Sequence, residues 1–169
     1  MTLLHHNIQK LEEIRLLLVE IPTEVYSKKK DILSGSSIGQ HFRHILEFYV
    51  CLKKGLPDDK ICYDSRERNI LIETDKNYAR YIIEELTQFI SEIHSDKKIN
   101  LMANYSVNPD EQIEINSSLF REFAYALDHT VHHLAIIRIA LSGENESIKI
   151  DANLGVAPST IRFRKQCVQ

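Results

Sequence analysis

Residues 118–143, SLFREFAYALDHTVHHLAIIRIALSG, decide the fold of this chain. Hydrophobic side chains recur in this segment at intervals of three and four residues, which is the spacing of one helix face. The pattern starts near Ser118, and Gly143 follows it as a typical helix end. We therefore expect one long amphipathic helix here, and the rest of the chain should supply the elements that cover its hydrophobic face.

Three further segments have the same helical periodicity. The first ends before Pro22, because proline interrupts helical hydrogen bonding. The second begins at Ser37, since Ser37 and Gln40 have the spacing of a capping box, and it ends at Gly55. Four amphipathic helices around one dominant core predict an all-α four-helix bundle. The three segments cover residues 3–20, 37–55 and 75–94.

The connections between these helices are of unequal length. Residues 56–74 read as a loop that is long for a compact domain, and such loops are usually functional or mobile. Residues 99–105 and 112–116 alternate in polarity, so we expect a small hairpin or an extended crossing between the third and fourth helices. The tail, residues 144–169, reads as irregular.

Length and composition limit the class of protein. The 169 residues predict a single domain, 1–169, with its core at about residues 3–143. The formal net charge is −3 and no basic stripe occurs, so we expect no nucleic-acid partner. No hydrophobic run has the length of a membrane span, and the first residues turn polar too early for a secretory signal. We therefore expect a cytoplasmic protein with free thiols at Cys51, Cys62 and Cys167.

Three histidines are the strongest chemical signal. His129 and His133 are four residues apart, so their side chains lie one above the other on a helix face that also carries the small Ala126. His44 on the second helix can supply a third nitrogen from a facing element. Three neutral nitrogens leave coordination positions open for water or substrate, which is the plan of a reactive metal site rather than a closed structural one.

A second interpretation of these histidines stays open at this point. A buried histidine is more often a hydrogen-bonded core residue than a metal ligand. Two buried imidazoles without partners would leave unpaired polar atoms, and each such atom costs about 1–3 kcal/mol. Either a metal ion or mutual hydrogen bonds would remove that cost.

Further polar side chains on the same two helices could support the site. His41 lies three residues before His44, and His132 points about 100° away from its neighbour His133 because of the helical period. Neither is expected to coordinate, and both could pack around the ligands. Glu47 and Asp128 are candidate carboxylates that orient imidazoles, although solvated surface acids are an equal alternative.

Two sequence segments together resemble a known superfamily. SIGQHFRHILEFY at residues 37–49 and DHTVHHLAIIR at residues 128–138 are similar to the DinB/YfiT-like superfamily of metal-binding four-helix bundles. The resemblance covers residues 3 to about 143. In that superfamily a histidine early in the second helix is followed, on the last long helix, by H-x-x-x-H. The match places the ligands at His44, rather than His41, and at His129 and His133.

The resemblance implies one divalent ion, commonly nickel, zinc or iron in relatives. Characterised relatives include low-molecular-weight thiol transferases, a thiol-dependent isomerase and the metal-binding bundle of a sulfoxide-forming enzyme in ergothioneine synthesis. It therefore implies a metal-dependent transferase that acts on a small thiol. The alternatives are a non-enzymatic metal- or ligand-binding stress protein, and a metal-dependent hydrolase with Glu47 or Glu122 as its base.

Two further expectations concern partners. Arg66 and Arg68 in the 56–74 segment could hold a substrate carboxylate in a bidentate fork, if this segment crosses the mouth of the site. The last helix has more aliphatic residues than one buried face requires, namely Ile136, Ile137 and Ile139, so a homodimer is expected through helix packing.

Overall fold

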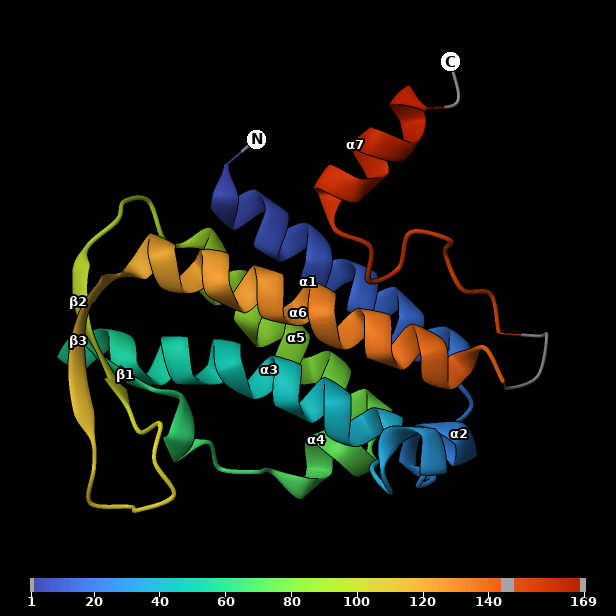
Figure 1. Ribbon diagram of the computed structural model, residues 1–169, viewed down its shortest axis with the longest axis horizontal. Coiled ribbons are helices and arrows are strands. Elements are labelled where there is room, and N and C mark those ends of the chain that lie inside the picture. Colours follow the sequence, from blue (N-terminus) through green and yellow to red (C-terminus); the bar gives the residue numbers. More distant parts are fainter. Residues whose placement is uncertain (1, 144–147, 168–169) are drawn as a thin grey trace.

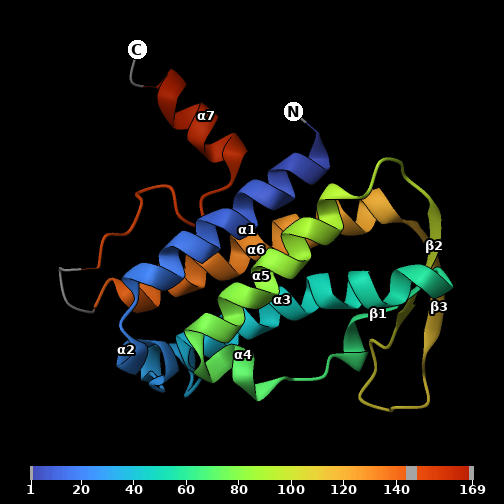
Figure 2. The same ribbon diagram turned by 180° about the vertical axis from the view of Figure 1, so that it is seen from behind.

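Four long helices form the body of the protein. The computed structural model describes residues 2–143 and 148–167, so residues 1, 144–147 and 168–169 of the expected domain and tail lie outside the described residues. Helix α3 packs against α6 and α5, and α1 packs against the same two helices, as Figures 1 and 2 show from opposite sides. The four are α1 (Leu3–Glu20), α3 (Ile38–Gly55), α5 (Lys76–Ser91) and α6 (Leu119–Leu141).

The prediction of a plain all-α four-helix bundle is wrong, because a three-stranded mixed sheet covers one end of the long helices. Strand β1 (Lys60–Cys62) runs parallel to β2 (Lys98–Ala103), and β2 pairs antiparallel with β3 (Ile113–Ser118). The sheet lies where α3 ends and α6 begins (Figure 1). Its middle strand has alternating burial, with Ile99 and Leu101 turned inward. Burial that alternates with a period of two residues is typical of a strand and does not fit the period of a helix.

Three short helices and three 3₁₀ turns among the described residues lie between and after the long helices, and some of them occupy segments expected to be irregular. The predicted 56–74 loop contains β1 and α4, because Ile61 and Ile72 are almost fully buried and hold the segment against the core. The predicted irregular tail contains α7, which projects from the body in Figure 1. The short elements are α2 (Thr23–Ser27), α4 (Ile70–Thr74), α7 (Pro158–Gln166), η1 (Asp31–Leu33), η2 (Leu56–Asp58) and η3 (Tyr63–Ser65).

The start of α3 is fixed by the predicted capping box and by one glycine. Ser37 accepts from the backbone N–H of Gln40, and the Gln40 side chain accepts from the backbone N–H of Ser37. A Cβ atom at Gly39 would lie 2.0 Å from the carbonyl oxygen of Glu73 in α4. Only glycine therefore allows α4 to pack so closely on α3. This contact also keeps residues 66–69, which lead into α4, beside α3.

A buried polar contact sets the position of α3 relative to α1 and α6. The Tyr49 hydroxyl donates to Asn7 Oδ1 on α1 at 2.9 Å and lies 3.3 Å from Thr130 Oγ1 on α6. Thr130 in turn donates to the carbonyl of Ala126 at 2.7 Å. Since buried polar groups need partners, these bonds favour one register of α3 against α6. That register decides which histidines meet.

Two sequence-based expectations concern the outer surface. Of the three isoleucines that motivated a homodimer, Ile137 is fully buried, Ile136 is partly buried and Ile139 is 55% exposed. The homodimer stays a prediction. No helix among residues 2–143 and 148–167 has both the length and the apolar character that crossing a membrane requires.

Candidate metal centre

Helices α3 and α6 run in opposite directions and bring three histidines together. Because the helices are antiparallel, the residue further along α3 meets the residue earlier on α6 (Figure 1). His44 Nε2 accordingly lies 2.9 Å from His129 Nε2. The ring of His133 is centred 4.6 Å from each of these two rings. One nitrogen of each residue lies within 4.8 Å of the others, so the three could hold a metal ion. We call His44, His129 and His133 the histidine centre.

The imidazoles of the histidine centre are neutral at neutral pH. Burial, with contributions from neighbouring positive groups, lowers the pKa of His44 to about 4, of His129 to about 4 and of His133 to about 3. The charged form is disfavoured because these rings lose water and gain no carboxylate partner. Neutral imidazole is the form that binds metals, so the protein environment prepares all three side chains as ligands.

The spacing of the ring nitrogens fits a small divalent ion. With metal–nitrogen bonds of about 2.0–2.1 Å, two ligands on one ion have nitrogens about 2.9–3.4 Å apart. The 2.9 Å between the facing nitrogens of His44 and His129 is at this separation. Nitrogen donors of this type suit zinc, nickel, iron and copper rather than calcium or magnesium.

The two remaining histidines of these helices have different positions. His41 Nδ1 lies 3.0 Å from His133 Nδ1, so one ring donates to the other and His41 orients a residue of the centre. His132 is exposed, and its ring stands perpendicular to that of His133 with 5.4 Å between centroids. His41 thus has the supporting contact that the sequence suggested, whereas His132 only packs beside the centre.

The carboxylates proposed as imidazole partners do not contact the histidine centre. Glu47 is buried, but it accepts from the backbone N–H of Asn69 at 2.7 Å and faces Arg43. Asp128 is exposed and makes no hydrogen bond or ion pair with a described residue. Glu122 is fully buried and is used by three partners. These partners are Tyr63, Ser117 and Arg121.

An aromatic wall on one side of the centre escaped the sequence analysis. Phe48 stacks on His129 with 4.2 Å between ring centroids, and Tyr125 lies at 5.8 Å on the same histidine. Tyr63 stacks on Phe48 at 4.5 Å. Helical spacing could have found two of these residues, because Phe48 follows His44 by four positions and Tyr125 precedes His129 by four.

Arg66 and Arg68, the two arginines suggested for substrate binding, lie in different surroundings. The Arg66 guanidinium carbon lies 5.3 Å from the centre of the Phe48 ring, and its Nη1 donates to the Tyr63 carbonyl at 2.5 Å. Arg68 is exposed, has a positive φ of 53° and lines no cavity found among the described residues. Arg66 is therefore the arginine of this segment that lies near the centre.

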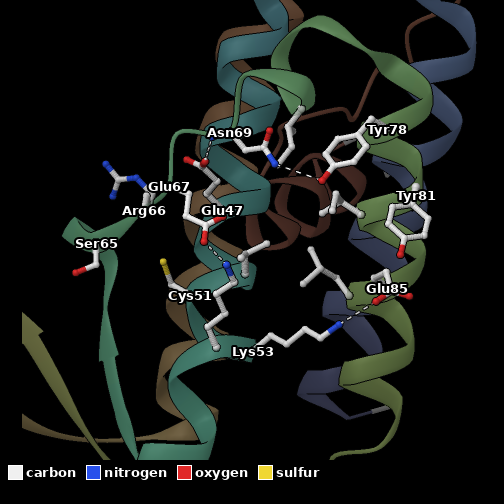
Figure 3. Close-up of a pocket in the computed structure, with 15 residues that line it drawn as sticks. Glu47, Cys51, Lys53, Ser65, Arg66, Glu67, Asn69, Tyr78, Tyr81 and Glu85 are labelled. Carbon is white, nitrogen blue, oxygen red and sulfur yellow. Dashed lines mark hydrogen bonds and ion pairs between the residues drawn. The ribbon is translucent and has the colours of Figure 1, made fainter.

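Two cavities meet at Arg66. The larger, about 490 Å³, lies between α3 and α5, and none of the histidines of the centre lines it. Figure 3 shows Lys53 reaching across it to Glu85, with Arg66 at its edge. We call it the α3–α5 cavity. The smaller, about 200 Å³, is lined by residues 101–105 in and after β2 and by Phe48 and Tyr125 of the aromatic wall. The smaller cavity therefore adjoins the histidine centre through shared aromatic residues, and the larger one does not.

Cys51 is poorly suited to act as a nucleophile. It lines the α3–α5 cavity, and burial raises the pKa of its thiol to about 11. A nucleophilic cysteine needs the thiolate form, which burial here disfavours. Cys51 is therefore not suited to supply a thiolate to the histidine centre.

Comparisons with known proteins give little further information. No protein-family model matches the chain, and no solved structure matches it. FK506-binding protein 5 of Rhizopus delemar is 33% identical over 107 residues, which are 62% of this chain and 27% of that protein. The chain thus spans about a quarter of the length of the curated relative it matches. The name of that relative says that it binds FK506, and it does not assign an activity to the aligned part.

Proposed function

We propose that this protein is a metal-dependent transferase that acts on a small thiol. The observation that carries the proposal is the histidine centre, in which three neutral imidazoles from two helices converge, while Cys51 on the helix of His44 lines a different cavity and has its thiol pKa raised. The resemblance of residues 37–49 and 128–138 to the DinB/YfiT-like superfamily supports it. The same resemblance favours nickel, zinc or iron as the ion.

Each residue of the site has a part in this function. His44, His129 and His133 would hold the ion, and His41 fixes the ring of His133 through their facing Nδ1 atoms. A bound divalent ion lowers the pKa of a thiol that coordinates it and so supplies a thiolate near neutral pH. Phe48 stacks on His129, and the exposed Tyr125 lies beside the same ring, so both would bound the space around the ion on that side.

The hydrolase alternative has less support from the geometry. A hydrolase of this kind needs a carboxylate base beside the attacking water. Glu47 is bonded to the backbone of Asn69, and Glu122 is bonded to three other side chains. A non-enzymatic metal- or ligand-binding protein stays the second candidate, because the histidine centre alone would serve it equally well.

We also propose that the protein works in the cytoplasm. Cys51, Cys62 and Cys167 are free thiols in the structure, and free thiols persist best in a reducing compartment. The distribution of the protein between cell fractions tests this proposal.

The reaction class can be tested with protein loaded with Co²⁺. Addition of 3-mercaptopropionate at millimolar concentration should produce a new sulfur-to-metal charge-transfer band. The band should be absent in His129→Ala and present in His132→Ala. Both variants lose one histidine, but His132 is exposed and lies outside the histidine centre. If no small thiol changes the spectrum of the loaded wild-type protein, the transferase proposal fails and the binding-protein candidate replaces it.

A further inference from the structure

We propose that the small cavity between Arg66 and Arg121 binds a carboxylate, so that the substrate is a thiol that also carries a carboxylate group. This inference rests on the proposed function for the thiol, and it adds a second recognition site on α6 and η3. We call this space the arginine cavity, and its volume is about 200 Å³.

The two guanidinium groups occupy equivalent positions over two neighbouring aromatic rings. The Arg66 guanidinium carbon lies 5.3 Å from the Phe48 ring centre, and that of Arg121 lies 5.4 Å from the Tyr125 ring centre. The Phe48 and Tyr125 rings are themselves 5.9 Å apart. Contact with an aromatic ring restricts where a guanidinium can point, and both arginines line the same cavity beside this pair of rings.

Both arginines keep donors for a ligand. Arg66 uses one nitrogen for the Tyr63 carbonyl, and Arg121 uses one for Glu122. The other guanidinium nitrogens make no hydrogen bond to any residue that the structure describes. A guanidinium has five N–H donors in a planar fork that matches a carboxylate, so two such groups can bind one carboxylate from two sides.

The charges around the arginine cavity favour a singly charged group. Asp64 is the acidic residue of its lining, and it accepts from the backbone N–H of Asn104 at 3.1 Å. The lining holds two guanidinium groups and one carboxylate, and Arg121 is also ion-paired with the buried Glu122 at 2.9 Å, so the free N–H donors of the two arginines, rather than a net positive charge, would hold an anion. Asp64 repels a doubly charged phosphate more strongly than a carboxylate, since the repulsion grows with the charge.

The position of the arginine cavity relative to the histidine centre suits a small bifunctional molecule. Phe48 and Tyr125 line the cavity and also pack on His129. Because these two rings are shared, a molecule with its thiol at the histidine centre and its carboxylate at the two arginines has to span them.

Two matched thiols test this inference. In protein loaded with Co²⁺, 3-mercaptopropionate should bind about tenfold more tightly than 2-mercaptoethanol, which has no carboxylate. Arg66→Gln and Arg121→Gln should each remove most of this preference and leave 2-mercaptoethanol binding and Co²⁺ content unchanged. Arg68→Gln is the matched control, because Arg68 is exposed outside the cavity, and it should keep the full preference. Equal binding of both thiols to the wild type would overturn the inference and leave the thiol proposal intact.

A second arm needs no metal and no thiol. Propionate titrated into metal-free protein should shift the side-chain Nε signals of Arg66 and Arg121 in nitrogen NMR spectra, and Arg121→Gln should weaken the Arg66 shift. If no thiol changes the Co²⁺ spectrum, this titration still tests the carboxylate site, because that site can exist without the proposed reaction. Absence of the shift in the wild type at tens of millimolar propionate would overturn the carboxylate site itself.

Discussion

Helix α3 carries two polar clusters that differ in how their members are satisfied. On one side, Arg43 bonds Glu73 and faces Glu47, so a partly buried cation lies between two buried acids. On the other side, the histidine centre contains only imidazoles, which meet one another and no carboxylate. The first cluster contains both charges that it needs. In the second, no cationic side chain of the described residues is paired with the imidazole nitrogens, so these ligand atoms are available to a metal ion.

This difference separates a structural cluster from a functional one. Breaking a buried ion pair is strongly destabilising, because removal of one partner leaves the other charged, desolvated and unpaired. A group of neutral imidazoles has little electrostatic energy to lose, but it gains a large amount when a metal ion binds. Substitutions in the two clusters should therefore affect different properties of the protein.

The largest effect is expected for substitutions in the histidine centre. His44→Ala or His133→Ala should weaken Zn²⁺ or Ni²⁺ binding by about a thousandfold, roughly 4 kcal/mol, since each removes one of three ligands. Calorimetric titration of metal-free protein measures this directly. His132→Ala provides the control, and retention of wild-type affinity in His44→Ala would show that the ion binds elsewhere.

The next effect concerns the cluster of Arg43, Glu47 and Glu73, where a substitution should lower stability and leave metal affinity unchanged. Arg43→Met should lower the free energy of unfolding by about 2–3 kcal/mol, because the buried Glu47 and Glu73 lose the cation that faces them, and the 20% exposure of the Arg43 side chain keeps the loss below that of a fully buried pair. Urea unfolding measures the loss. Metal affinity should be unchanged, and a variant that loses metal but keeps its stability would reverse the roles that we assign to the two clusters.

The sequence predicted the long helices, the histidine centre and, as one of two alternatives, the hairpin of β2 and β3, but not strand β1 or the arginine cavity. The capping box at Ser37 and the pair His129 and His133 are local patterns, so short windows of sequence contain them. Strand β1 has only three residues and forms because β2 pairs with it from far along the chain. No local pattern contains such a partner.

The parts that sequence reasoning missed near the site have a similar cause. Arg121 looks like an ordinary surface residue at the start of a helix, and its relation to Arg66 depends on how two distant segments pack. Helix α7 has no buried residue, so its sequence has no hydrophobic face to detect. Of the two carboxylates considered as imidazole partners, Glu47 is buried and pairs with other groups, whereas Asp128 is exposed, which is the alternative that the sequence left open.

A smaller effect on metal binding is expected from His41. His41→Ala should weaken metal affinity by about 10–100-fold, since it removes the group that orients His133 but no ligand. His41→Gln should recover part of this loss, because its amide can still bond to the Nδ1 atom of His133. Equal losses in His41→Ala and His44→Ala would instead make His41 a ligand.

The smallest effect is a change of stability with pH in the metal-free protein. The pKa values of the histidine centre, about 3–4, lie below that of an unfolded histidine near 6.5. As the pH falls below about 6.5, the unfolded chain binds protons that the folded chain does not, so stability decreases until the folded pKa values are reached. After allowance for partial exposure, we expect a loss of about 1–2 kcal/mol between pH 7 and pH 5.

Urea unfolding of the wild type and of His133→Phe at several pH values measures this dependence. The variant should show a shallower decrease, because it lacks the imidazole with the lowest pKa of the three. A wild-type stability that does not change between pH 7 and pH 5 would mean that the three rings are accessible to protons in the folded protein.

The most direct test of the account is a crystal structure of the protein grown with Zn²⁺, with diffraction data on both sides of the zinc absorption edge. We predict one anomalous peak with nitrogens of His44, His129 and His133 at about 2.0–2.1 Å and with at least one position left for a non-protein ligand. His41 should contact His133 and not the ion. A peak coordinated by His41 with His44 turned away, or no peak between α3 and α6, would contradict the central claim.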